Sequence, residues 1–255
     1  YLLSVLAGED KTIFTIDDVR KIIARDARKT MHSLAQKKWV LPLKRGLYTI
    51  VPLDIGVKGA DHFAVHEFVV AAHLVEPYYI GFWSALNYHG LTDQIPRTVF
   101  VATTRAKMKL NILANTFYFV KLSPHKFFGF VQEKVAGTTV LISDPAKTIA
   151  DCLDHPEHAG GIDEVAKALY FSHQELDFAT IKEYAERMRN SAIFKRLGWC
   201  LERTGLLDRY EFAFSGVRLG SGYSKLAPLA PPRGRHDRRW RLLINYEIDS
   251  QRWES

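Results

Sequence analysis

The chain has 255 residues, of which nearly half are hydrophobic, so it can bury a sizeable core in one large domain or in a small domain followed by a medium one. Its formal net charge is +7 and it has only two cysteines, which argues against a disulfide framework or a cysteine zinc site and makes a reduced cytoplasm the expected setting. No apolar run is long enough to span a membrane, and the first ten residues lack the basic leader of a signal peptide.

The positive charge is concentrated at the two ends of the chain. Residues 1–52 carry a net charge of +5, residues 53–216 one of −2 and residues 217–255 one of +4. A basic end on a neutral body is typical of a DNA-binding segment attached to a part with another role. We therefore expect a DNA-binding domain at 1–52 and a second domain at 62–255, of which 217–255 forms a basic tail.

The stretch 14–51 predicts a winged helix-turn-helix. Thr15 is suited to cap a helix whose first turn carries two aspartates, which favour the positive end of the helix dipole. A short turn at 24–26 then leads into a second helix. On that helix the apolar residues share one face, and they are Ala27, Met31 and Leu34.

The opposite face of this second helix is basic, and a hairpin with a basic tip follows it. Gly46 supplies the positive φ that a tight hairpin turn needs. A basic helix face alone usually means only a solvated surface. The order of the pieces favours DNA binding, because in such a module the second helix enters the major groove and the hairpin tip reaches phosphates or the minor groove. The expected DNA-binding residues are Arg25, Arg28, Lys29, His32, Gln36, Lys37, Lys38, Lys44, Arg45 and Tyr48.

The rest of the chain predicts an α+β fold, in which a larger mixed domain with a small sheet and a helical C-terminal half follows the winged helix. Residues 52–61 contain two glycines and a proline and predict a linker. Capping and apolar periodicity predict helices over 62–75 and 79–90, one that begins at Asp144-Pro145, and three more over 163–171, 177–188 and 191–204. Runs of β-branched and aromatic residues predict strands over 98–103, 116–122, 127–131, 138–142 and, in the tail, 240–246.

Three segments carry a family resemblance. They are WVLPLKRGLYTI at 39–50, YYIGFWSALNYHGLTDQIPRTVFVAT at 78–103 and ISDPAKTIADCLDHPEHAGGIDEVAKAL at 142–169. In this order they resemble AbiEi-type antitoxins and related winged-helix regulators. The resemblance covers most of residues 15–205, whereas the tail after Gly216 matches only loosely.

This resemblance implies the antitoxin of a type IV toxin–antitoxin pair. Such a protein represses its own operon by binding inverted repeats in double-stranded DNA. It also counters a nucleotidyltransferase-like toxin without forming a stable complex with it. The residues themselves support only the DNA-binding half. Two alternatives therefore remain: a ligand-sensing regulator without a toxin, and a nucleic-acid-processing enzyme that its winged helix delivers to the substrate.

The strongest candidate for a catalytic centre lies on the helix that begins at Asp144. Asp144, Lys147 and Asp151 can share one face of that helix, and carboxylates beside a lysine can serve nuclease chemistry. Each has a simpler interpretation, because Asp144 fits the N-cap and the other two form an exposed ion pair one turn apart. We therefore expect no catalytic residue and no enzyme activity.

Two histidine pairs and one arginine cluster complete the candidate sites. The pair His62/His66 has metal-compatible spacing, but no third ligand of matching character follows nearby. The pair His155/His158 lies in a loop beside Asp154 and Glu157 and likewise lacks a third ligand of matching character. We therefore expect no metal and no cofactor. The arginine-rich stretch 233–241 is interpreted either as an exposed, partly ordered tail or as a second nucleic-acid contact.

Overall fold

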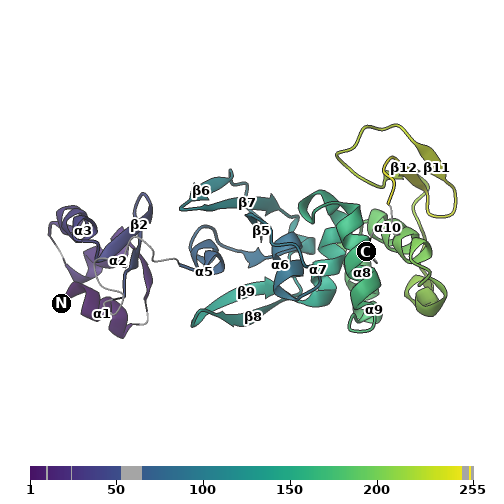
Figure 1. The fold of residues 1–255 in the computed structure, drawn as a ribbon. Helices are drawn as coiled ribbons and strands as arrows, with labels where there is room; N and C mark the ends of the chain where they lie inside the picture. The colour runs from purple at the N-terminus through teal and green to yellow at the C-terminus, as the bar shows by residue number, and fades with distance from the viewer. Residues whose placement is uncertain (10, 24, 53–64, 249–252, 254–255) are drawn as a thin grey trace.

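Helices and strands form an α+β fold in three groups that follow one another along the molecule (Figure 1). The computed structural model describes residues 1–9, 11–23, 25–52, 65–248 and 253. Residues 53–61 of the predicted linker and the start of the helix predicted at 62 lie outside these residues. No helix in the described part of the chain is long and apolar enough to cross a membrane.

The first group contains the two helices and the hairpin expected over 14–51, together with a helix and a short strand that precede them. It consists of α1 (Leu2–Gly8), β1 (Ile13–Thr15), α2 (Ile16–Ile22), α3 (Ala27–Gln36), β2 (Val40–Lys44) and β3 (Leu47–Ile50). Strand β3 lies between β1 and β2 and is antiparallel to both. The predicted cap of α2 is present, since the Thr15 backbone N–H donates to the Asp18 carboxylate at 2.8 Å and the Asp18 N–H donates to the Thr15 hydroxyl at 3.2 Å. Gly46 has a φ of +79°, as the predicted hairpin turn requires.

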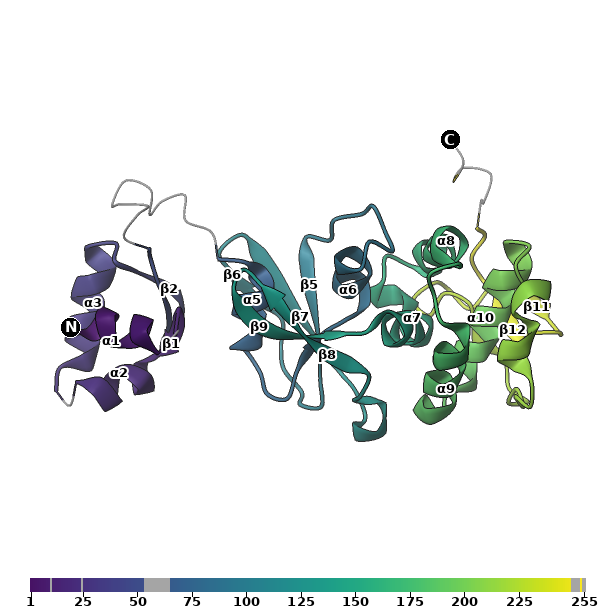
Figure 2. The same cartoon turned by 90° about the horizontal axis from the view of Figure 1, so that it is seen from below.

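The three-stranded sheet lies between helices α1–α3 and the second domain (Figure 2). One side of it, with α1–α3, encloses a small core. From its other side Ile13, Leu43 and Leu47 enter the same apolar cluster as residues of α5 (Glu67–Ala72). The two domains therefore share a buried contact, and α3 faces away from it.

A mixed six-stranded sheet forms the middle of the molecule. Its strands are β4 (Tyr79–Ile80), β5 (Thr98–Thr103), β6 (Leu110–Ile112), β7 (Asn115–Lys121), β8 (Phe130–Val135) and β9 (Thr138–Ser143), in the order β6-β7-β5-β4-β9-β8. Alternation along β5 places Val99 and Val101 in the cluster that contains α5, and Phe100 and Ala102 in the cluster on the opposite face. Helices α6 (Phe82–Tyr88) and α7 (Pro145–Asp154) cover that opposite face.

Three details of this sheet differ from the sequence predictions. Tyr79 and Ile80 form the short central strand β4, whereas the sequence predicted that they begin a helix. Both are fully buried between neighbouring strands, and two residues are too few to show a strand periodicity. Strand β6 was not predicted, and β8 begins at Phe130, three residues later than expected.

The C-terminal half is helical, as predicted, and the tail is folded onto it. Helices α8 (Ile162–Ser172), α9 (Phe178–Met188) and α10 (Ser191–Arg203) agree with their predicted bounds to within one residue at each end. In the tail, β12 (Leu242–Ile244) lies between β10 (Ser224–Lys225) and β11 (Arg235–Asp237). Trp240 is buried and its Nε1–H donates to Glu202 of α10 at 2.6 Å, so the tail is anchored while its arginine side chains stay exposed.

Candidate nucleic-acid interface

Helix α3 presents a basic face to solvent. Asp26 precedes it in the left-handed conformation, with a φ of +58°. Ala27 and Met31 are buried on its inner side, and Leu34 is half-buried. The expected contact residues on and around the helix are all exposed, and they are Arg25, Arg28, Lys29, His32, Gln36, Lys37 and Lys38. Ala24, in the predicted turn, lies outside the described residues.

A groove of about 480 Å³ separates α3 from the hairpin. Arg28 and His32 line it from the helix, and Arg45 and Tyr48 line it from the hairpin. Arg28 and Arg45 have no ion pair or hydrogen bond with any residue in the described part of the chain. Their charges therefore remain available to a polyanion such as the phosphate backbone of DNA. The floor of the groove is mostly apolar and is formed by Ile16, Met31, Ala35, Pro42 and Gly46.

Tyr48 is fixed at the edge of the groove by its neighbour on β1. Its ring stacks on that of Phe14, with centroids 6.0 Å apart and planes 24° apart, and Phe14 itself is buried. The structure thus brings four of the predicted residues together around the groove. The other predicted residues do not line the groove. Lys29 and Gln36 lie on α3, and Arg25, Lys37 and Lys38 lie just beyond its ends.

Lys44, one of the expected DNA-binding residues, is not fully exposed at the hairpin tip. It is half-buried, and burial together with the charge of Lys107 from the second domain lowers the pKa of its ammonium group. The register of β2 against β3 shifts between Pro42 and Lys44, and an irregularity of this kind re-aims the side chains beside it. Arg45 is therefore the exposed cation of the hairpin tip, while Lys44 lies near the second domain.

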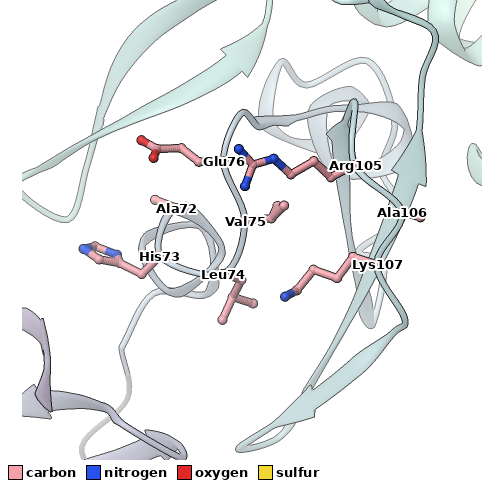
Figure 3. Close-up of a pocket in the computed structure, with 8 residues that line it drawn as sticks. All are labelled: Ala72, His73, Leu74, Val75, Glu76, Arg105, Ala106 and Lys107. Atoms are coloured by element: carbon pink, nitrogen blue, oxygen red, sulfur yellow. The ribbon is translucent and has the colours of Figure 1, made fainter. Parts of the chain in front are cut away.

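A second hollow, of about 510 Å³, was not predicted from the sequence. It lies between the C-terminal end of α5 and the loop after β5, and Figure 3 shows the side chains of Arg105 and Lys107 extending into it from that loop. His73 and Glu76 lie on the other wall. The basic run from Arg105 to Lys109 was the available signal, but nothing in the sequence indicated that α5 would face it.

Asp144 caps α7 as predicted, but the interpretation of Lys147 and Asp151 as an exposed pair is wrong. The Asp144 carboxylate accepts from the Lys147 backbone N–H at 2.8 Å. The Lys147 and Asp151 side chains pair with each other in the interior, where both residues are fully buried. Tyr79 donates to the Asp151 carboxylate at 2.7 Å, and burial beside this carboxylate raises the Tyr79 pKa well above its usual range. A substrate has no access to such a pair.

The structure also assembles three possible metal ligands. His155, Glu157 and His158 offer ligand atoms that all lie within 4.8 Å of one another. The sequence analysis found no third ligand of matching character for the pair His155/His158, whereas the structure brings the neighbouring Glu157, on the short 3-10 helix Pro156–His158, within reach of both histidines. In the other pair, His66 caps α5 by accepting from the Phe68 backbone N–H at 3.2 Å, and His62 lies outside the described residues.

No protein-family model matches this chain, and no curated protein sequence matches it. Among solved structures, the crystal structure of the RV2827C protein from Mycobacterium tuberculosis has a similar fold, with a TM-score of 0.63. The two sequences are 13% identical, and the match covers 94% of this chain and 88% of that protein. At this identity the likeness shows the fold alone, across both the N-terminal and the second domain.

Proposed function

We propose that this chain is a DNA-binding transcriptional repressor and the antitoxin of a type IV toxin–antitoxin pair. Its N-terminal group acts as a winged helix-turn-helix on double-stranded operator DNA with inverted repeats. The observation that carries the DNA-binding half is the groove between α3 and the hairpin, where Arg28 and Arg45 lack any acidic partner among the described residues. The setting we propose is the cytoplasm, and the activity requires no cofactor and no catalytic residue.

The roles of the two arginines follow from their positions. Arg28 lies in the first turn of α3, the part of a recognition helix that contacts base edges in the major groove. Its guanidinium suits the O6 and N7 acceptors of guanine. Arg45 lies at the tip of the hairpin, across the groove, where a phosphate of the same strand or the minor groove would be in reach.

The test is a gel-shift titration on DNA from upstream of the gene, with random DNA of equal length as competitor. Arg28→Ala should weaken specific binding by about 1–3 kcal/mol and random binding by less, because a base contact carries sequence information. Arg20→Ala on α2 is the matched control, since Arg20 is exposed and paired with Asp17 at 2.6 Å. Equal losses on both DNAs would make Arg28 a phosphate contact, and no loss on either would refute the interface.

The antitoxin half rests on the resemblance to AbiEi-type antitoxins. We expect a nucleotidyltransferase-like protein to be encoded beside this gene, and co-expression of the full chain should relieve the growth arrest that it causes. The two proteins should not co-purify. If no such gene lies beside this one, or if this chain does not relieve the growth arrest, the antitoxin role is refuted and the chain is a stand-alone regulator.

The hollow beside α5 favours one second candidate function, a ligand-sensing regulator. Its volume falls in the range of small-molecule sites, and Arg105 and Lys107 would suit an anionic ligand. Lys44 of the hairpin lies close enough to Lys107 for the two charges to interact. An anion bound in the hollow would therefore change the electrostatic environment of the hairpin. An anionic metabolite that stays with the purified protein and changes its operator affinity would support this candidate. No comparable observation favours a nucleic-acid-processing enzyme.

A further inference from the structure

We propose that His155, Glu157 and His158 bind one divalent transition-metal ion of the zinc type and leave one coordination position open. The three residues follow the C-terminus of α7, where a short 3-10 helix leads toward α8. The site is separate from the groove of the N-terminal group. It would give the second domain an ion-binding site that the proposed DNA binding by the N-terminal group does not require.

The spacing of the ligand atoms fits a tetrahedral ion. Bonds of about 2.0–2.1 Å place two ligand atoms of a tetrahedral zinc site roughly 3.3 Å apart. The His155 Nδ1 and Glu157 Oε1 atoms are already 3.1 Å apart, and no pair of ligand atoms in the cluster is separated by more than 4.8 Å. Ligand atoms that lie farther apart than about 3.3 Å would have to draw together when the ion binds.

A carboxylate lies behind His155, at ion-pair distance from the ring nitrogen that faces away from Glu157. The His155 Nε2 atom is 3.5 Å from Asp154 Oδ2, on the ring edge opposite the nitrogen that faces Glu157. Asp154 is itself held by Lys126 Nζ at 2.6 Å and by Asn190 Nδ2 at 2.5 Å. A carboxylate that accepts from the outer ring N–H fixes the tautomer and orients the inner nitrogen toward the ion. His155 would therefore ligate through Nδ1.

The other two ligands have unused polar atoms. Glu157 Oε2 is buried and has no hydrogen-bond partner among the described residues. The ring nitrogens of His158 likewise have no hydrogen bond in that part of the chain. The His158 ring is held by contacts with Phe82, Phe100 and Tyr118, whose centroids lie 5.1–5.7 Å from its own. The aromatic rings hold His158 from one side. On the other side, a bound cation would supply the partner that the nitrogen and oxygen atoms lack.

The donor set selects the class of ion. Two imidazoles and one carboxylate suit Zn²⁺, Co²⁺, Ni²⁺ and Cu²⁺, whereas Mg²⁺ and Ca²⁺ prefer sites built from oxygen alone. Three protein ligands leave the fourth tetrahedral position to water or to a group from a bound molecule. The alternative is an ion pair between His155 and Glu157 with no metal, and the experiments below separate the two.

The first experiment titrates Zn²⁺ into tag-free full-length protein that has been dialysed against a chelator, with heat as the readout. We expect one ion per chain, and Co²⁺ in its place should give the visible absorption of a tetrahedral complex. Glu157→Gln and His158→Gln should each weaken binding at least tenfold. His125→Gln, at an exposed histidine elsewhere in the second domain, should leave it unchanged. Binding that neither variant alters, or no stoichiometric binding at all, would overturn the proposal.

A second measurement keeps the inference testable if a ligand variant does not fold. Nitrogen-detected NMR of the histidine rings in the wild-type chain should show His155 ligated through Nδ1 and protonated at Nε2 after Zn²⁺ is added. Asp154→Asn should lower the affinity by about 10–100-fold, because it removes the carboxylate charge that lies beside the outer nitrogen of the His155 ring. Rings of His155 and His158 that do not respond to Zn²⁺ would show that the site is only an ion pair.

Discussion

Lys147 and Asp151 lie one turn apart on α7, and both are fully buried with Tyr79 from the central strand as their shared partner. The Lys147 Nζ atom is 3.1 Å from the Tyr79 hydroxyl oxygen. The stem of Lys147 packs against Gly129, where an added Cβ would lie 2.9 Å from the Lys147 Cβ. These contacts connect α7 to β4 and to the start of β8, so the pair organises the interior of the second domain.

The first expected outcome concerns this pair. Asp151→Asn should lower the free energy of unfolding by about 3–5 kcal/mol, because it leaves the buried Lys147 ammonium without its counter-ion. The triple variant Tyr79→Phe/Lys147→Met/Asp151→Leu should recover most of that loss, since apolar side chains of similar size replace both charges and the hydroxyl that binds them. Urea unfolding followed by circular dichroism measures both values.

The exposed pair Asp17–Arg20 on α2 provides the matched control. Its atoms are also in contact, at 2.6 Å, but both side chains are at least half exposed to solvent. Asp17→Asn should therefore cost no more than about 1 kcal/mol. If the two single aspartate substitutions cost the same, Lys147 and Asp151 do not form a buried pair in solution.

At the scale of elements, the two basic residues of the hairpin tip lie beside different parts of the molecule. Arg45 lines the groove beside α3, whereas Lys44 lies close to Lys107 of the second domain. Each phosphate contact contributes about −0.9 to the slope of log affinity against log salt concentration. Arg45→Ala should therefore make this slope shallower by about 0.9, and Lys44→Ala should leave it nearly unchanged. Operator binding constants measured at several salt concentrations give the slope for each variant. Equal changes of slope in the two variants would mean that Lys44 and Arg45 both contact DNA.

The tail sheet depends on one glycine of α10. A Cβ added at Gly198 would lie 2.0 Å from the Trp240 ring, so any larger residue would displace the tail from the helix. Gly198→Ala should destabilise the chain by about 1–3 kcal/mol, as overpacking does. It should also speed tryptic cleavage at the exposed arginines of residues 233–241. Gly222→Ala is the control, because nothing lies within 4 Å of its added Cβ, and cleavage at equal rates in both variants would show that Gly198 does not anchor the tail.

Elements with their own local chemistry could be predicted from the sequence. The strand 98–103 is a run of β-branched and aromatic residues, and α7 begins at an aspartate–proline pair that caps and starts a helix by itself. The Thr15–Asp18 cap and the Gly46 turn are local in the same way. Their side-chain patterns need no partner elsewhere in the chain.

Features that depend on distant residues could not be predicted in this way. A lysine and an aspartate one helical turn apart have the same sequence spacing whether the pair is exposed to solvent or buried. The buried arrangement of Lys147 and Asp151 depends on hydrogen bonds with Tyr79, which is far away in the sequence. The two-residue strand β4 exists because β5 and β9 pair with it on either side. The basic face of α3 could be predicted from helical spacing, but the position of Lys44 depends on a domain contact that no local pattern reveals.

At the scale of the whole molecule, helix α3 and the shared domain contact lie on opposite sides of the N-terminal group (Figure 2), and the hairpin takes part in both the groove and the contact. Helices α1–α3 lie on the outer side of that group, and the three-stranded sheet faces the second domain (Figure 2). The basic tail lies at the other end of the molecule, beside α10 (Figure 1). DNA on the outer face of α3 would therefore lie away from the tail of the same chain, whereas the hairpin side of the groove borders the second domain near Lys107.

This arrangement gives an expected outcome for separated domains. A fragment that ends near Leu53 should still bind the operator region, and one that begins near His62 should not. The first fragment should be less stable than the same group in the full chain, because separation exposes Ile13, Leu43 and Leu47. Full exposure of an apolar side chain of this size costs about 1.5–3 kcal/mol of stabilising free energy. Gel shifts measure binding, and thermal unfolding with and without the second domain measures the stability difference.

The arginine-rich tail is the feature that could contradict this expectation, because the second fragment keeps its exposed side chains. Weak binding of that fragment to any DNA, abolished at higher salt, would be an electrostatic contact of the tail and would leave the assignment intact. Replacing Arg233, Arg235 and Arg238 with alanine should then remove it, while operator binding by the full chain stays the same. Selective binding of the operator by the second fragment would place sequence recognition there, and α3 would not be the recognition helix.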